Sequence, residues 1–107
     1  MIRALFICSR NRLRSPTAEQ LFGAWPGVQT DSAGLAADAE VRLSAEHIDW
    51  ATLIFVMEKA QRSKLQRQYR RVLAGKRVIC LDIADDYAFM QAELQALLHS
   101  RVGRYLR

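Results

Sequence analysis

The sequence predicts an α/β fold in which buried parallel strands alternate with helices. Two segments carry this prediction: residues 2–7 are apolar apart from Arg3, and residues 52–57 form an uninterrupted β-branched and aromatic run. Continuous apolar runs of this length are typical of strands buried on both faces of a parallel sheet. Segments with apolar residues at helical spacing separate the runs, so right-handed crossovers would place helices on both faces. We therefore expect a three-layer α/β sandwich with a four-stranded parallel sheet, formed by residues 1–107 as one domain.

Capping and turn residues set the expected boundaries of these elements. Ser15 is a favourable N-cap, Pro16 suits the first position of a helix, and Pro26-Gly27 ends that helix. Ser44 is a candidate cap for a short second helix, and Gly75 closes a basic third one. The expected strands span 2–7, 28–33, 52–57 and 77–81, and the expected helices span about 16–25, 44–50, 59–73 and 88–100.

Composition limits the classes of function. The chain is half hydrophobic, carries a net charge of +5 and has a pI of about 9.8, which favours anionic partners. Two cysteines far apart in sequence do not suggest a disulfide framework, so free thiols in a reducing cytoplasm are expected. The apolar run after Met1 is too short for a signal peptide, and no stretch is long enough to span a membrane. We expect a cytoplasmic protein without a membrane partner, and the sequence leaves its oligomeric state open.

The segment from Cys8 to Ser15 joins the first apolar run to the first helix. At the carboxyl end of a strand and the N-terminus of a helix, free N–H groups and the helix dipole favour an anion. Arg14 adds a guanidinium that can grip two oxygens, and positive surroundings favour the thiolate form of a cysteine. The alternative is a buried strand-end cysteine followed by solvated arginines, but packing alone needs no arginine at position 14. The segment therefore predicts a thiolate site for a tetrahedral oxyanion.

The pattern Cys-x5-Arg-Ser, with the Ser-Pro-Thr-Ala-Glu of residues 15–19, resembles the low-molecular-weight protein tyrosine phosphatase family. The Ser-Ala-Gly at 32–34 and the Met-Glu at 57–58 extend the resemblance. It implies a flavodoxin-like fold with strand order 2-1-3-4. It also implies a nucleophile, Cys8, an arginine that grips phosphate, Arg14, and a serine that supports the thiolate, Ser15. An asparagine, Asn11, would hold the turn open. The implied phosphate-binding loop comprises Cys8, Ser9, Arg10, Asn11, Arg12, Leu13, Arg14 and Ser15.

A proton donor for the leaving oxygen is expected in the acidic segment 82–86. The family places its general acid in an Asp-Pro-Tyr segment, and the alignment implies Asp85 as the acid and Tyr87 as an aromatic substrate wall. Asp86 stands where the proline would be and is the alternative general acid. As carboxyl ends of parallel strands share one sheet edge, this segment and the Cys8 loop are expected to meet.

The resemblance implies a two-step hydrolysis through a cysteinyl-phosphate, with no metal and no cofactor. Arg10 and Arg12 either attract phosphorylated substrates or are solvated, and these interpretations are equally supported. Glu58 is a candidate partner of Arg14, although an ordinary strand-end acid is favoured. The two histidines, His47 and His99, are expected on helix surfaces. The basic run between Arg62 and Arg71 lacks interleaved aromatics, which favours a solvated face over a nucleic-acid partner.

The sequence therefore predicts a phosphatase acting on phosphate monoesters, with phosphorylated protein, above all phosphotyrosine, or a small aryl phosphate as substrate. One alternative is a thiol-dependent arsenate reductase, but that chemistry needs further thiols and only Cys80 remains, in an apolar strand. Another is a non-catalytic basic module that binds phosphate or RNA, but pure binding needs no nucleophile. Leu13 replaces the second loop cysteine of many relatives, which excludes a disulfide within the loop.

Overall fold

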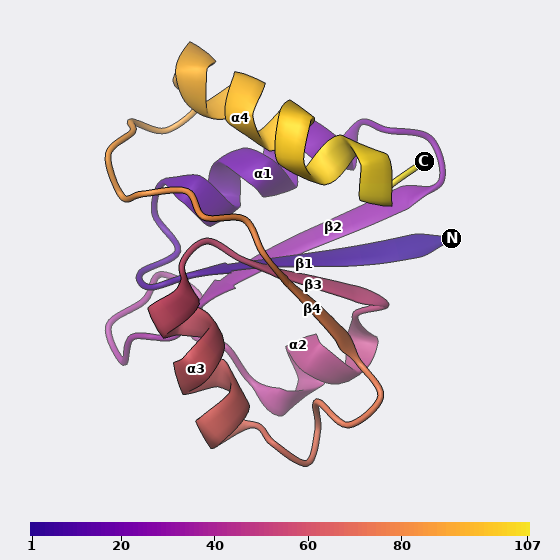
Figure 1. Cartoon of the computed structure of the whole chain (residues 1–107), viewed down its shortest axis with the longest axis vertical. Helices are drawn as coiled ribbons and strands as arrows, with labels where there is room; N and C mark the ends of the chain where they lie inside the picture. Colours follow the sequence, from indigo (N-terminus) through magenta and orange to yellow (C-terminus); the bar gives the residue numbers. More distant parts are fainter.

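The computed structural model describes all 107 residues as one sheet with helices on both faces (Figure 1). All strand pairs are parallel, and the order β2-β1-β3-β4 confirms the predicted topology. The strands are β1 (Ile2–Cys8), β2 (Val28–Gly34), β3 (Leu53–Val56) and β4 (Arg77–Cys80), and the helices are α1 (Arg14–Gly23), α2 (Ala45–Trp50), α3 (Lys59–Gln68), α4 (Ala92–Val102) and a short 3-10 turn, Gly103–Tyr105.

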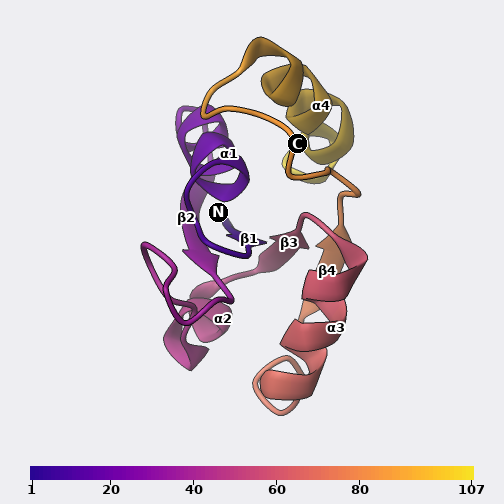
Figure 2. The same cartoon turned by 90° about the vertical axis from the view of Figure 1, so that its left-hand side faces the viewer.

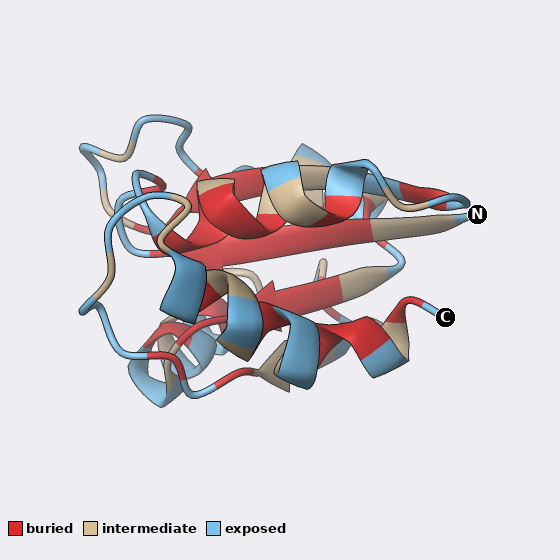
Figure 3. Ribbon diagram, turned by 90° about the horizontal axis from the view of Figure 1, so that it is seen from above, coloured by how far each residue is buried: buried red, intermediate tan, exposed pale blue.

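Alternate residues of β1 enter two separate cores, as the period of two in a strand requires. Phe6 faces α1 and α4, where its ring stacks on Phe22 at 5.8 Å and on Phe55 at 5.1 Å between ring centres. Leu5 and Ile7 face α2 and α3. The central strands β1 and β3 and the inward faces of the helices are mostly buried, while the outward helix faces are exposed (Figure 3). The central strand is thus fixed from both sides.

The first helix begins two residues earlier than the sequence predicts. Arg14 is its first residue and Leu13 precedes it without a side-chain cap, so Ser15 is not the N-cap. The Ser15 hydroxyl instead lies within hydrogen-bond distance of the Cys8 sulfur. The helix ends at Gly23, before Pro26, because a turn from Ala24 to Gly27 already leads into β2.

Two further helix boundaries differ from the prediction. The third helix ends at Gln68 instead of Leu73, and turns follow as far as Gly75, which has the positive φ of 79° expected of a closing glycine. The last helix begins at Ala92, not at 88, because Met90 adopts a positive φ of 58°. Phe89 therefore lies outside the helix and is 48% exposed.

The carboxyl ends of the strands form one edge of the molecule, which faces the viewer in Figure 2. The loop after β1, the start of α3 and the long connection after β4 all lie at this edge (Figure 2), while both chain termini lie at the opposite end (Figure 1). The expected meeting of the Cys8 loop and the acidic segment is thereby confirmed. No helix is both long and apolar enough to cross a membrane.

Candidate active site

The Cys8 loop is a tight turn that begins directly at the end of β1. Asn11 has a positive φ of 57°, a conformation that asparagine tolerates better than most residues. This turn brings the Asn11 backbone N–H to 3.2 Å from the Cys8 sulfur, to which it donates a hydrogen bond. The Ser15 hydroxyl lies 2.9 Å from the same sulfur. Cys8 is therefore buried by the loop that follows it, with polar hydrogens near its sulfur.

A chain of side-chain hydrogen bonds holds the Cys8 loop in this conformation by linking it to α1 and β2. The Asn11 amide donates to the Ser15 hydroxyl at 3.0 Å and to the Ser32 hydroxyl at 2.9 Å. Ser32 in turn donates to the carboxylate of Glu19 on α1. Asn11, Ser15 and Ser32 are all at least 95% buried, so the loss of any one would leave a buried polar group without its partner. The asparagine thus holds the turn, as the resemblance implies, through contacts to α1 and β2.

The segment that follows β2 packs against the Cys8 loop. Its contact with the loop begins at Gly34, the last residue of β2, which pairs with Cys8 at the end of β1. The N–H groups of Leu35 and Ala36 donate to the carbonyls of Cys8 and Ser9 at 3.0 and 2.8 Å. A Cβ atom on Gly34 would lie only 2.6 Å from the Ser9 carbonyl oxygen. The close approach of these two backbones therefore requires a glycine.

Four carbonyls of the loop accept backbone hydrogen bonds, but most of its N–H groups have no protein partner. The acceptors are the carbonyls of Cys8, Ser9, Arg10 and Leu13. No protein acceptor pairs with the backbone N–H groups of residues 9, 10 and 12–15, whereas Asn11 donates to sulfur. Because α1 starts at Arg14, its first N–H groups have no carbonyl within the helix to bind. An anion is the partner that such a set of donors favours.

Arg14 lines the same cavity as Cys8 while remaining 97% buried. Its Nη1 donates to the Ile83 carbonyl at 2.7 Å and pairs with Glu58 at 3.2 Å. Its Nε lies 3.7 Å from the carboxylate of Asp85. Glu58 is thus a direct partner of Arg14, and the favoured interpretation of it as an ordinary strand-end acid is wrong.

A cavity of about 240 Å³ opens above the sulfur. Asp85 lines it and its side chain is 64% exposed, whereas Asp86 is exposed elsewhere and does not line it. Tyr87 does not line it either: its half-buried ring packs against the apolar core of α1 and α4. The cavity walls are Cys8, Ser9, Arg10, Arg12, Leu13, Arg14 and Asp85.

Arg10 and Arg12, which line the cavity, each lie near a carboxylate that partly neutralises their charge. Arg10 lies 4.0 Å from Asp38 and Arg12 lies 3.4 Å from Glu40, and all four side chains are at least half exposed. Exposed pairs of this kind contribute little to stability. Both guanidiniums therefore remain available to solvent and to any ligand at the mouth of the cavity.

Gln61, a residue that the sequence analysis did not single out, ties the loop to α3. Its carbonyl oxygen accepts the N–H groups of Met57 and Glu58 at 2.9 and 3.0 Å. Its amide donates to the Ser9 hydroxyl and to the Glu58 carboxylate, both at 3.2 Å. The signal was present in the sequence, because a glutamine three residues after a helix-capping side chain is the pattern of a capping box.

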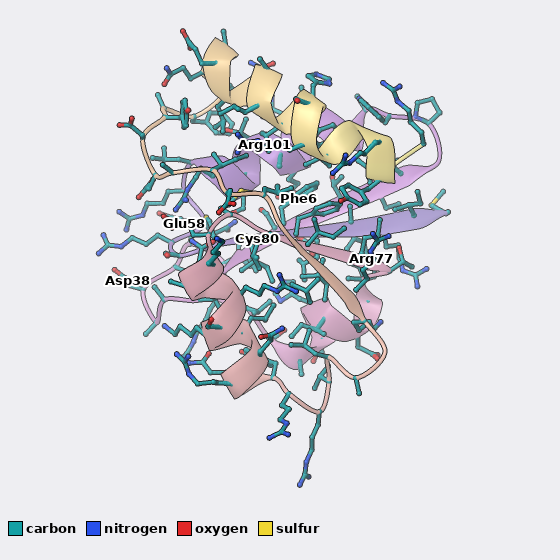
Figure 4. The ribbon with its side chains drawn as sticks, in the orientation of Figure 1. Phe6, Asp38, Glu58, Arg77, Cys80 and Arg101 are labelled. Atoms are coloured by element: carbon teal, nitrogen blue, oxygen red, sulfur yellow. The ribbon has the colours of Figure 1, made fainter.

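The remaining candidates lie away from the cavity. Cys80 is a half-buried free thiol at the end of β4 (Figure 4). His47 completes the capping box of α2 by accepting the Ser44 N–H at 3.0 Å, at the position that a glutamate or glutamine usually occupies. His99 packs its ring against Phe22 and Trp25. These contacts account for both histidines structurally.

No protein-family model and no curated protein matches the chain. Solved structures match it over nearly its whole length. The YwlE arginine phosphatase from Geobacillus stearothermophilus is 25% identical, with a TM-score of 0.79 over 99% of this chain and 93% of that one. The tyrosine phosphatase AmsI from Erwinia amylovora is 24% identical, with a TM-score of 0.76 over 98% and 91%. The tyrosine phosphatase Wzb from Escherichia coli K30, solved with phosphate, is 22% identical, with a TM-score of 0.78 over 99% and 97%. The chain thus shares the fold of these phosphatases over nearly its whole length, in agreement with the resemblance of its loop motif to the low-molecular-weight protein tyrosine phosphatase family.

Proposed function

We propose that the chain is a cysteine-dependent phosphatase that hydrolyses phosphate monoesters. One observation carries the proposal: the Cys8 sulfur, the Arg14 guanidinium and the Asp85 carboxylate line the same small cavity. These groups are a nucleophile, a positive clamp and a proton donor, which is the set that displacement at phosphorus requires. The phosphatases that share the fold support the same class of reaction.

In the proposed first step the Cys8 thiolate attacks phosphorus in line with the leaving oxygen. The S–P bond forms as the P–O bond breaks, and Asp85 transfers its proton to the departing oxygen. In the second step Asp85 takes a proton from water, whose oxygen attacks phosphorus and releases Cys8 and inorganic phosphate. The unpaired loop N–H groups and Arg14 stabilise the charge on the other phosphate oxygens in both steps.

Phosphorylated protein is the proposed substrate, and phosphotyrosine is the first residue to test. The tyrosine phosphatases AmsI and Wzb support this choice, and the arginine phosphatase YwlE makes phosphoarginine the natural comparison. No aromatic side chain lines the cavity, so a tyrosyl leaving group gains no ring contact from its walls. Tyr87 would have to leave its place against the apolar core to act as the proposed wall.

Hydrolysis of p-nitrophenyl phosphate tests the proposal directly. We expect the wild-type chain to release p-nitrophenolate, vanadate to inhibit it, and Cys8→Ser to abolish turnover. Cys80→Ser is the matched control, because it makes the same change at the only other thiol, and it should keep full activity. Turnover that survives Cys8→Ser would exclude the proposed nucleophile. Phosphotyrosine, phosphoserine and phosphoarginine peptides assayed in parallel then identify the substrate residue.

A further inference from the structure

The positive charge of the chain is concentrated in a single segment. Residues 59–77 contain eight of the sixteen basic residues and none of the eleven acidic ones. The rest of the chain therefore holds eight basic against eleven acidic residues, and this segment alone makes the protein basic. The segment comprises α3, the turns after it and the start of β4.

Two of these eight cations have structural partners, and six have none. The Lys76 ammonium donates to the carbonyls of Asp49 and Ala51 at 2.9 and 2.8 Å, and Arg77 lies over the Tyr105 ring. The other six make no ion pair, no side-chain hydrogen bond and no cation–π contact, and five of them are exposed. We call this set the basic face: Lys59, Arg62, Lys64, Arg67, Arg70 and Arg71.

The spacing of the basic face is unfavourable for the isolated helix. Lys59 and Arg62, and likewise Lys64 and Arg67, are three residues apart in α3, where like charges repel and destabilise the helix. Helices usually relieve such repulsion with acids at neighbouring positions, but α3 contains none. An external anion would supply the missing charge.

The face is also hollowed and begins at the active site. Arg67 and Arg70, with Ser63, Gln66 and Ala74, line a wide, open depression of about 650 Å³ beside the buried Leu73. At the other end of the helix, its cap Glu58 contacts Arg14, and Lys64 lies beside the Ser9 loop in a smaller cavity. Figure 4 shows Glu58 at the same edge as Asp38, with Arg77 at the far end of the sheet. The basic face therefore leads away from the phosphate-binding loop along α3.

We infer that the basic face is a docking surface for an acidic segment of the phosphorylated protein substrate. Arg67 lies nine residues beyond Glu58, which is about 14 Å along a helix and is spanned by about four residues of extended chain. Acidic residues about four to six positions from the phosphorylated residue would thus reach Arg67 and Arg70. The inference rests on the proposed phosphatase function, because the phosphate must occupy the Cys8 cavity at the same time.

A polypeptide fits this surface better than a nucleic acid does. Single-stranded nucleic acids bind to aromatic side chains that stack on their bases. The one aromatic of α3 and its following turn, Tyr69, is half-buried, and its hydroxyl donates to the Leu43 carbonyl at 2.9 Å. The face thus offers charge alone, which suits glutamate and aspartate side chains.

The test compares two phosphotyrosine peptides that differ only in the four residues at positions four to seven after the phosphotyrosine. These residues are glutamates in one peptide and glutamines in the other. We expect the wild-type kcat/KM to be about tenfold higher for the glutamate peptide at low salt, through KM, and the preference to shrink as salt rises. The variant Arg67→Gln/Arg70→Gln should lose most of this preference. It should hydrolyse p-nitrophenyl phosphate as the wild type does, because neither arginine touches the Cys8 cavity.

Arg104→Gln/Arg107→Gln is the matched control, since it removes two exposed arginines near the C-terminus, at the end of the molecule away from the site (Figure 1). This variant should keep the preference. Equal kcat/KM values for the two peptides with the wild type, or a preference that survives Arg67→Gln/Arg70→Gln, would overturn the inference.

Binding of fluorescent unphosphorylated versions of the two peptides separates docking from catalysis. The glutamate peptide should bind the wild type more tightly than the glutamine peptide, and Arg67→Gln/Arg70→Gln should remove the difference. If p-nitrophenyl phosphate is not hydrolysed but this binding pattern appears, the proposed function fails while the docking surface stands. If a single-stranded RNA binds through these two arginines and the glutamate peptide does not, the partner is a nucleic acid and the inference is wrong.

Discussion

Replacing Gly34 with alanine should damage the phosphate-binding loop without touching any group that takes part in the chemistry. The new Cβ would lie 2.6 Å from the Ser9 carbonyl oxygen and from the Ala39 Cβ, and 3.0 Å from the Arg10 carbonyl carbon. Two of these neighbours are backbone atoms, so relief requires the loop to move by about 0.8 Å to reach an ordinary contact of about 3.4 Å. Overpacking of this kind costs about 1–3 kcal/mol of stability. A displacement of about 1 Å at a reacting group costs roughly a hundredfold in rate.

Thermal unfolding and p-nitrophenyl phosphate kinetics together test this expectation. Gly34→Ala should lower the melting temperature by about 5 °C or more and kcat/KM by about a hundredfold. Gly103→Ala is the matched control, because its Cβ meets only the Trp25 ring at 3.4 Å and it lies far from the loop. It should change stability by less than about 1 kcal/mol and leave kcat/KM intact. A fully active and stable Gly34→Ala protein would refute the close approach of the two backbones.

Three other substitutions test separate parts of the site. Asn11→Ala removes the hydrogen bonds that the side-chain amide donates to Ser15 and Ser32, and it puts alanine at a positive φ. Urea unfolding should therefore show a loss of about 1–3 kcal/mol in the free energy of unfolding, and kcat should fall. Unchanged stability would contradict the role of this hydrogen-bond network. Glu58→Gln removes the charge that faces Arg14 at 3.2 Å, so kcat/KM for p-nitrophenyl phosphate should fall about tenfold with little change in melting temperature; an unchanged rate would make the contact structural only. Asp85→Asn should lower kcat by about 10²–10⁴-fold, while Asp86→Asn, its matched control, should not; the reverse result would move the acid to position 86.

The sequence predicts the fold well because its main determinants are local and repetitive. The buried runs of β1 and β3 are apolar on both faces, and only a parallel sheet covered on both sides accommodates them. The helix ends were less predictable. Ser15 has a high propensity for the N-cap, but its hydroxyl makes a tertiary contact with Cys8 instead. Met90 adopts a left-handed conformation, so the last helix begins after it.

The site was predicted as a set of residue types, but its geometry was not. The loop motif identifies Cys8 and Arg14 as neighbours because their spacing is short and fixed. The pairing of Arg14 with Glu58 and the anchoring of Ser9 by Gln61 connect residues more than 40 positions apart, and no local pattern reports such contacts. The position of Tyr87 was likewise not predictable from the sequence, because its ring packs against the apolar core of α1 and α4.

The central claim is that the Cys8 sulfur carries the phosphoryl group during turnover. Rapid acid quenching of the enzyme with p-nitrophenyl phosphate, followed by mass spectrometry of its peptides, tests this most directly. The account predicts one phosphoryl group per chain, located on the peptide that contains Cys8 and absent from the Cys80 peptide. A phosphoryl group on any other residue, or steady turnover with no phosphorylated peptide at any quench time, would contradict it.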